Sequence, residues 1–108
     1  SGIKDMLAAK EPPLKILSMI SRQFRILLMI SDLTERGCPA REIPERLKIH
    51  PFVARKAAAQ SKNFSKPLLT SALKILSQLD VGVKTGKMEF YPAIETFLLT
   101  LNSKEKSG

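Results

Sequence analysis

The stretch ERLKIHPFVARKAAAQ, residues 45–60, combines residue types that can contact DNA. A short helix is expected to end just before His50, and Pro51 then opens a second helix that carries Arg55 and Lys56. This is the outline of a helix-turn-helix, in which the first residues of the second helix contact the edges of the bases.

The first residues of that second helix do not suit base recognition. Base edges are read by side chains with hydrogen-bond donors and acceptors, whereas Pro51, Phe52 and Val53 are apolar. These three residues favour packing against a protein neighbour. Arg55 and Lys56 can still reach phosphates, so non-specific DNA contact stays open. We therefore predict the shape of a helix-turn-helix without sequence-specific DNA recognition.

Basic residues are concentrated in one part of the chain. The 108 residues carry a net charge of +8, and no acidic residue occurs between Arg46 and Leu79. An acid-free block of this kind indicates an anionic neighbour, either nucleic acid or an acidic protein surface, or else a solvated basic face. The cations of the block are Arg46, Lys48, Arg55, Lys56, Lys62, Lys66 and Lys74.

The stretch VGVKTGKM, residues 81–88, resembles a phosphate-binding loop but lacks its defining features. Gly82 and Gly86 enclose three residues where the motif has four. Met88 replaces the hydroxyl that binds Mg²⁺, and a helix precedes the stretch where the motif requires a strand. We predict instead a helix end at which Gly86 adopts the left-handed conformation.

The chain offers little else that could support catalysis. His50 is the only histidine, and we expect it to cap or pack on the helix that follows. The single Cys38 cannot form an internal disulfide, which fits a reducing cytoplasm. The longest apolar run, Ile26–Ile30, is too short to cross a membrane. We expect no catalytic residue, no metal, no cofactor and no membrane partner.

The spacing of apolar residues predicts an all-α fold, a compact bundle of five or six helices. Pro44 lies five residues into one short segment, so that helix either begins near Pro44 or is kinked there. The expected helices cover residues 3–9 (the end of a first helix), Pro13–Arg36, Pro39–Leu47, Pro51 to about Lys62, Pro67 to about Lys84, and a last helix opened by Pro92.

The helix expected from Pro13 to Arg36 is the most apolar, and we predict that it is central in the bundle. Two arginines, Arg22 and Arg25, flank Phe24 in its middle. They either extend their charged ends to solvent or contact acidic groups of another subunit. Its core face is expected to consist of Leu17, Ile20, Phe24, Leu27 and Ile30.

The two ends of the chain differ from its middle. Ser1-Gly2 resembles the remnant of a cleaved tag, and the last residues are polar. We therefore expect a fragment of a longer protein. It divides into residues 1–11 (a tag remnant and the end of a truncated first helix), a helical domain over 12–102, and a disordered tail over 103–108.

Three stretches in this order resemble one protein family: SRQFRILLMI (21–30), KIHPFVARKAAAQSKNFS (48–65) and LDVGVKTGK (79–87). They are similar to the C-terminal domain of the delta subunit of the bacterial DNA polymerase III clamp loader. The resemblance runs from about Pro12 to Leu101. The sequence departs from the family pattern at Pro44, where a helix former is expected, and at Lys48, where glycine is common.

This resemblance implies a non-catalytic, all-helical collar domain of a cytoplasmic bacterial protein, within one of the components of a DNA polymerase holoenzyme. Five loader subunits, including the gamma/tau and delta prime types, join through such domains, while an N-terminal part absent here contacts the sliding clamp. The alternative is a nucleic-acid-binding module that uses residues 39–66. The contact candidates are Arg22, Arg25, Phe52, Arg55 and Lys56, and the structural candidates are Phe24, His50, Pro51, Asp80 and Gly86.

Overall fold

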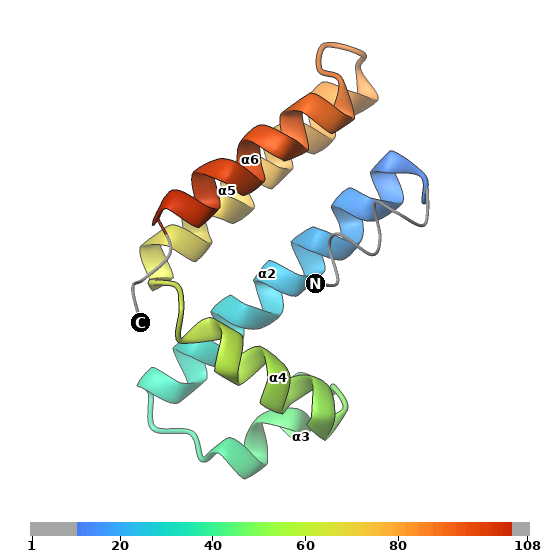
Figure 1. The fold of residues 1–108 in the computed structure, drawn as a ribbon. Coiled ribbons are helices and arrows are strands. Elements are labelled where there is room, and N and C mark those ends of the chain that lie inside the picture. The colour runs from blue at the N-terminus through green and yellow to red at the C-terminus, as the bar shows by residue number, and fades with distance from the viewer. Residues whose placement is uncertain (1–10, 105–108) are drawn as a thin grey trace.

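The computed structural model describes residues 11–104, and every regular element in this range is helical (Figure 1). This confirms the predicted all-α bundle. The helix expected over residues 3–9 lies outside the described residues. The elements are α2 (Pro13–Glu35), the 3-10 turn η1 (Ala40–Glu42), α3 (Ile43–Leu47), α4 (Pro51–Ser61), α5 (Lys66–Lys84) and α6 (Phe90–Lys104).

Helix α2 is central, as predicted, because α3, α4 and α5 all pack against it. The five residues expected on its core face are all buried, and Ile16 and Ile26 extend that face. Gln23 on α2 also donates a hydrogen bond from Nε2 to Oε1 of Gln60 on α4, at 2.9 Å. The bundle therefore holds α4 against α2 by both apolar and polar contacts.

Helices α5 and α6 form an antiparallel pair (Figure 1), and α5 packs against both α2 and α6. Phe24 is the aromatic link between α2, α6 and the segment that precedes α5. Its ring centroid lies 5.8 Å from that of Phe97 on α6 and 6.2 Å from that of Phe64, just before α5. The Phe24 side chain thus contacts two segments that are distant from it in sequence.

The structure decides between the two alternatives left open at Pro44, and both ends of α6 differ from the expected ones, each for a physical reason. Pro44 is the second residue of α3, where its missing N–H needs no partner, so the helix starts there instead of kinking. Pro92 does not open α6, because buried Phe90 begins the helix and proline is tolerated in the first turn. Ser103 and Lys104 belong to α6, not to a tail, since no helix breaker follows buried Leu101.

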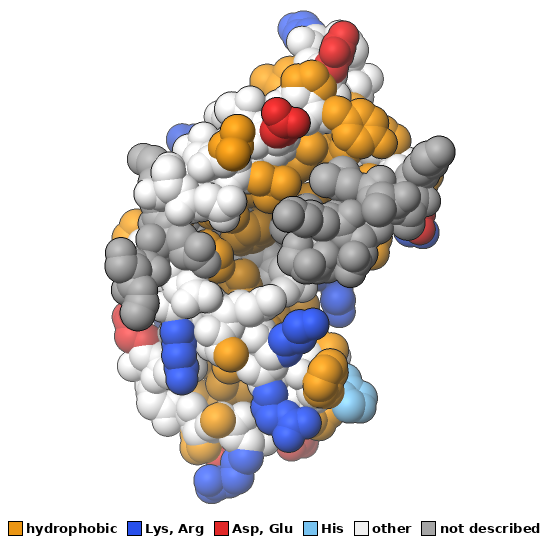
Figure 2. Space-filling view, viewed as in Figure 1, with side chains coloured by type: hydrophobic (Ala, Val, Ile, Leu, Met, Phe, Trp, Pro, Cys, Tyr) orange, Lys and Arg blue, Asp and Glu red, His pale blue; other side chains and the backbone are white. Residues whose placement is uncertain are grey.

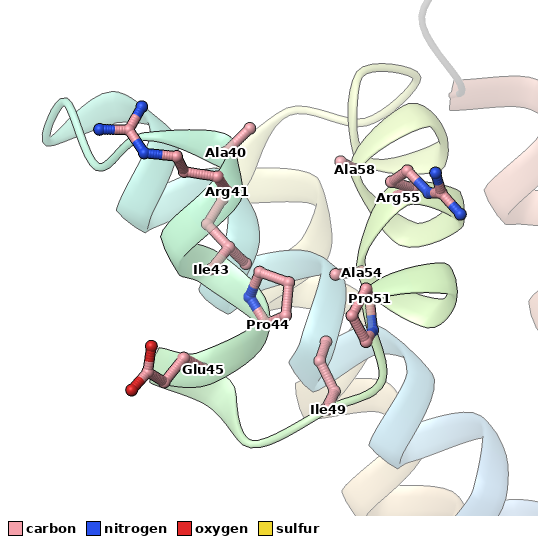
Figure 3. Close-up of a pocket in the computed structure, with 10 residues that line it drawn as sticks. All are labelled: Ala40, Arg41, Ile43, Pro44, Glu45, Ile49, Pro51, Ala54, Arg55 and Ala58. Atoms are coloured by element: carbon pink, nitrogen blue, oxygen red, sulfur yellow. The ribbon is translucent and has the colours of Figure 1, made fainter.

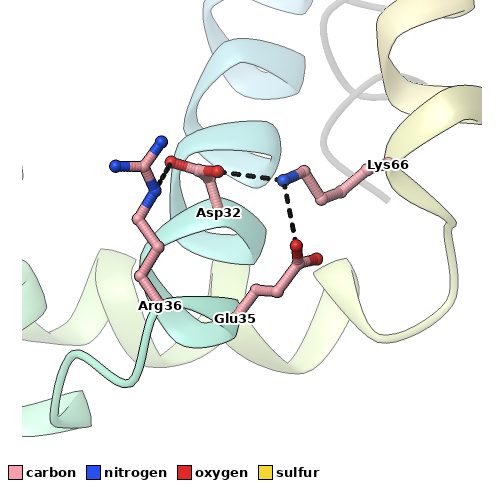
Figure 4. A network of polar contacts seen from close by, with 4 residues as sticks. All are labelled: Asp32, Glu35, Arg36 and Lys66. Atoms are coloured by element: carbon pink, nitrogen blue, oxygen red, sulfur yellow. Dashed lines mark hydrogen bonds and ion pairs between the residues drawn. The ribbon is translucent and has the colours of Figure 1, made fainter.

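An ion-pair network joins the end of α2 to the start of α5 (Figure 4). Lys66 Nζ lies 2.9 Å from Asp32 Oδ1 and 3.6 Å from Glu35 Oε1, while Arg36 Nε lies 3.0 Å from Asp32 Oδ2. Acidic groups near a helix C-terminus and a cation at a helix N-terminus are both unfavourable. In the structure the carboxylates of Asp32 and Glu35 lie near the N-terminus of α5, and Lys66 lies near the C-terminus of α2. Each charge therefore has the favourable sign for the neighbouring helix end.

We expect this network to make stability depend on pH at both extremes. The hydrogen bond from Lys66 holds the pKa of Asp32 below its ordinary value, and the same bond raises the pKa of Lys66. The contribution of Asp32 to the free energy of unfolding is therefore lost as the pH falls below about 4. The Lys66 contribution is lost as the pH rises above about 10.

The measurement is a series of thermal melts of the wild-type chain and Lys66→Met from pH 2 to pH 7. The difference between their Tm values should shrink below about pH 4. Lys74→Met is the control, because Lys74 has no ion pair within the described residues. A Lys66→Met difference that stays constant over this range contradicts the assignment.

Candidate functional site

Helices α3 and α4 form the predicted helix-turn-helix shape, with Lys48, Ile49 and His50 as the turn. His50 caps α4, because its Nδ1 accepts a hydrogen bond from the Phe52 backbone N–H at 3.0 Å. Pro51 occupies the first helical position, as the sequence indicates. Both residues therefore set where α4 begins and in which direction it leaves the turn.

The turn contains the one non-glycine residue with a positive φ among the described residues. Lys48 has φ 56° and ψ 47° at the end of α3. The Ile49 N–H donates to the Pro44 carbonyl at 2.9 Å, and the Lys48 N–H to the Glu45 carbonyl at 3.3 Å. This is a Schellman motif.

The same motif ends α2 and α5, but there glycine takes the left-handed position. Gly37 has φ 87° and Gly86 has φ 76°. The Lys87 N–H donates to the Gly82 carbonyl at 2.9 Å, and the Gly86 N–H to the Val83 carbonyl at 3.2 Å. The stretch that resembles a phosphate loop is therefore a helix end, as predicted.

We expect Lys48→Gly to stabilise the chain by roughly 0.5–1 kcal/mol. A side chain in the left-handed region costs about 1–2 kcal/mol, and the extra freedom of glycine in the unfolded chain offsets part of that gain. Urea unfolding followed by circular dichroism measures the change. Gly37→Ala should act in the opposite direction, since a Cβ there meets no atom within 4 Å and only the backbone is strained. A Lys48→Gly variant that is less stable than the wild type would contradict the assignment of backbone strain to Lys48.

The outer face of α4 is apolar at its start and basic further along. The Phe52 side chain is 58% exposed, and Val53, Arg55 and Lys56 are exposed too. Figure 2 shows Lys and Arg side chains gathered around α4, next to the pale blue histidine, which is His50. Neither basic residue forms an ion pair within residues 11–104. This face can therefore contact an anionic surface.

A groove separates α4 from η1 and α3, with a volume of about 740 Å³ (Figure 3). Two of its lining residues, Ile43 and Ala54, are buried and face each other across it. Arg41 and Arg55 come from opposite walls. The full lining is Ala40, Arg41, Ile43, Pro44, Glu45, Ile49, Pro51, Ala54, Arg55 and Ala58. This groove was not predicted from the sequence, where the only signal for it was the small size of Ala54 and Ala58.

The arginines of α2 lie elsewhere. Arg22 and Arg25 are exposed, as are Met19 and Met29 on the same helix. We call these four residues the Met–Arg stripe. Arg25 also lines a cleft of about 420 Å³ between α2 and α5, together with Asp80.

The predicted candidates therefore do not form a single site. Phe52, Arg55 and Lys56 belong to α4, whereas Arg22 and Arg25 belong to the Met–Arg stripe. The structural candidates are placed in the core or at helix ends. Phe24 is buried, and Asp80 Oδ2 lies 2.8 Å from Lys84 Nζ, one turn along α5.

Residues 11–104 offer neither a metal site nor a membrane span. No group of three or more histidine, cysteine or acidic side chains in this range could hold a metal ion. No helix in the same range has the length and apolar character of a membrane span.

Comparison with known proteins agrees with the resemblance predicted from the three stretches. Residues 1–101 match the family described as the DNA polymerase III delta subunit, C-terminal domain. The chain is 37% identical over 104 residues to a DNA polymerase III subunit delta of Bacillus subtilis (strain 168), covering 96% of this chain and 30% of that relative. A solved Bacillus subtilis DNA clamp loader delta protein matches with a TM-score of 0.82 at 37% identity, covering 91% of this chain and 29% of that one. The chain thus spans less than a third of the length of these relatives.

Proposed function

Because the chain belongs to the family of C-terminal domains of the DNA polymerase III delta protein, we propose that it is a non-catalytic assembly domain of a clamp loader. In this proposal the helical domain joins subunits of the gamma/tau and delta prime types in the ring that loads the sliding clamp onto DNA. Contact with the clamp itself belongs to another part of the full-length protein.

The Met–Arg stripe is the observation that supports assembly most directly. Methionine and arginine are enriched at protein interfaces, since one is an adaptable apolar group and the other is a multiple hydrogen-bond donor. Met19 is 39% exposed and Met29 is 42% exposed. Arg22 and Arg25 have no ion pair within the described part of the chain. A partner with apolar and acidic groups would cover all four side chains.

The test is gel filtration with light scattering of this chain mixed with the C-terminal domains of gamma/tau and delta prime type subunits. We expect a stable complex at about 0.15 M salt that persists at higher salt, because apolar burial is not screened. The double variant Arg22→Glu/Arg25→Glu should abolish it. Lys74→Glu/Lys87→Glu is the matched control, with the same change in charge at exposed residues outside the stripe. No complex at either salt would overturn the proposal for this chain.

A second candidate function is non-specific DNA binding by α4. It is favoured by the exposed Arg55, Lys56 and Lys62 in a region without acidic residues. Such binding should weaken steeply with salt, with a slope of log affinity close to one for each phosphate contacted. Titration of a labelled DNA duplex at several salt concentrations tests this. A complex with DNA that is insensitive to salt, or no complex at low salt, would exclude it.

A further inference from the structure

We propose that the groove between η1–α3 and α4 binds a short acidic amphipathic helix of another protein. Apolar side chains of that helix would occupy the space over Ile43 and Ala54, and its carboxylates would pair with Arg41 and Arg55. This proposal does not rest on the assembly function, because it concerns residues of η1, α3 and α4 and none of the Met–Arg stripe on α2.

The shape of the groove suits an inserted helix. Ala54 and Ala58 lie one turn apart on α4 and both face the groove. Their short side chains leave space for the side chains of an inserted helix. The opposite wall has the bulkier Ile43 and Pro44 (Figure 3). A volume of about 740 Å³ lies within the range of clefts that bury a ligand, and grooves between helices commonly accept the apolar face of an amphipathic helix.

The depth of burial shows which part of the groove is apolar. Ile43 and Ala54 are at most 4% exposed, and Ile49 and Ala58, which also line the groove, are half-buried. Water in such a groove has few polar partners among these side chains. An apolar side chain that replaces it is therefore stabilised by the hydrophobic effect.

The charges around the groove indicate the sign of the partner. Arg41 and Arg55 come from opposite walls and flank the groove, with their guanidinium groups directed away from its centre (Figure 3), and neither has an ion pair within residues 11–104. Glu45 is the one acidic residue of the lining. A partner with carboxylates on both flanks of its apolar stripe can therefore pair with both arginines.

The charge of the whole chain argues against another copy of itself as the occupant. Each copy carries a net charge of +8, so two copies repel each other. Duplex DNA fits the groove poorly as well, because its apolar floor offers no donors to phosphates. An acidic protein segment is the ligand that fits both the apolar floor and the basic rim.

The experiment is a selection from a phage library of random peptides of about 15 residues, which is roughly four helical turns, against the 108-residue chain. We expect the enriched peptides to be acidic, with apolar residues at positions i, i+3, i+4 and i+7. One labelled peptide is then titrated by fluorescence anisotropy. Enrichment of basic peptides, or no enrichment, would overturn the proposal.

Two matched pairs of variants locate the binding. Ala58→Glu fills the groove and should abolish binding, whereas Ala59→Glu puts the same charge on the exposed neighbour and should not. Arg55→Glu should weaken binding about tenfold, and Lys56→Glu by much less. If Ala58→Glu fails to fold, the comparison of Arg55→Glu with Lys56→Glu still tests whether the peptide binds in the groove. Equal losses for Arg55→Glu and Lys56→Glu would show non-specific attraction and refute the groove as the site.

Discussion

Phe24→Ala should lower the free energy of unfolding by about 3–5 kcal/mol, the range for removing a buried phenylalanine. The Phe24 side chain is only 3% exposed. It packs edge-on against Phe97, with an interplanar angle of 79°, and against Phe64 at 59°. The substitution leaves a cavity where α2 meets α6 and the start of α5. A typical domain has a total stability of only about 5–15 kcal/mol, so this variant should be close to unfolding at about 37 °C.

Urea unfolding followed by circular dichroism measures this loss. Phe52→Ala is the matched control, since it removes the same ring from a side chain that is 58% exposed, and it should change stability by less than about 0.5 kcal/mol. A double-mutant cycle of Phe24 and Phe97 should give a coupling of about 0.5–1.5 kcal/mol. Equal losses for Phe24→Ala and Phe52→Ala would mean that the aromatic link does not hold the bundle together.

The local parts of this structure are predictable from the sequence because each depends on neighbouring residues. The core face of α2 follows from apolar spacing, and Gly37 and Gly86 end their helices because glycine readily adopts a positive φ. The start of α6 was wrongly placed for the same local reason. Proline restricts a helix only after its first turn, so Pro92 is compatible with a start at Phe90.

The contacts between distant segments could not be predicted in this way. Nothing close to Phe24 in sequence indicates Phe97 as its partner. The groove depends on how α3 and α4 are spaced by the turn, whereas Ala54 and Ala58 in the sequence indicate only a good helix former. The sequence does contain a weak indication of the ion pair between Asp32 and Lys66, since each charge has the unfavourable sign for its own helix end.

Gly82 provides the second large expected effect, because the chain returns over it after α5. The backbone N–H groups of Lys87 and Met88 both donate to the Gly82 carbonyl, at 2.9 and 3.0 Å. A Cβ added at Gly82 would lie 2.6 Å from Met88 Sδ and 2.7 Å from Met88 Cγ. Such contacts are too short, so the Met88 side chain or the backbone must shift to admit an alanine.

We therefore expect Gly82→Ala to destabilise the chain by about 1–3 kcal/mol, the usual cost of overpacking. Helix propensity alone predicts the opposite, a gain of about 1 kcal/mol for alanine over glycine in a helix interior. The sign of the effect thus decides between packing and propensity at this position.

The decisive measurement is the same substitution in a Met88→Ala background, again by urea unfolding. Met88→Ala removes Sδ and Cγ, so only the Cβ contact at 3.1 Å remains. Gly82→Ala should then cost little or become stabilising, which gives a coupling of at least about 1 kcal/mol. Gly86→Ala is the control, since its Cβ would meet no atom within 4 Å and its cost comes from φ alone. Its effect should therefore be the same in both backgrounds. If Gly82→Ala lowers the free energy of unfolding equally in the wild-type and Met88→Ala backgrounds, contact with the Met88 side chain is not the reason for glycine at position 82.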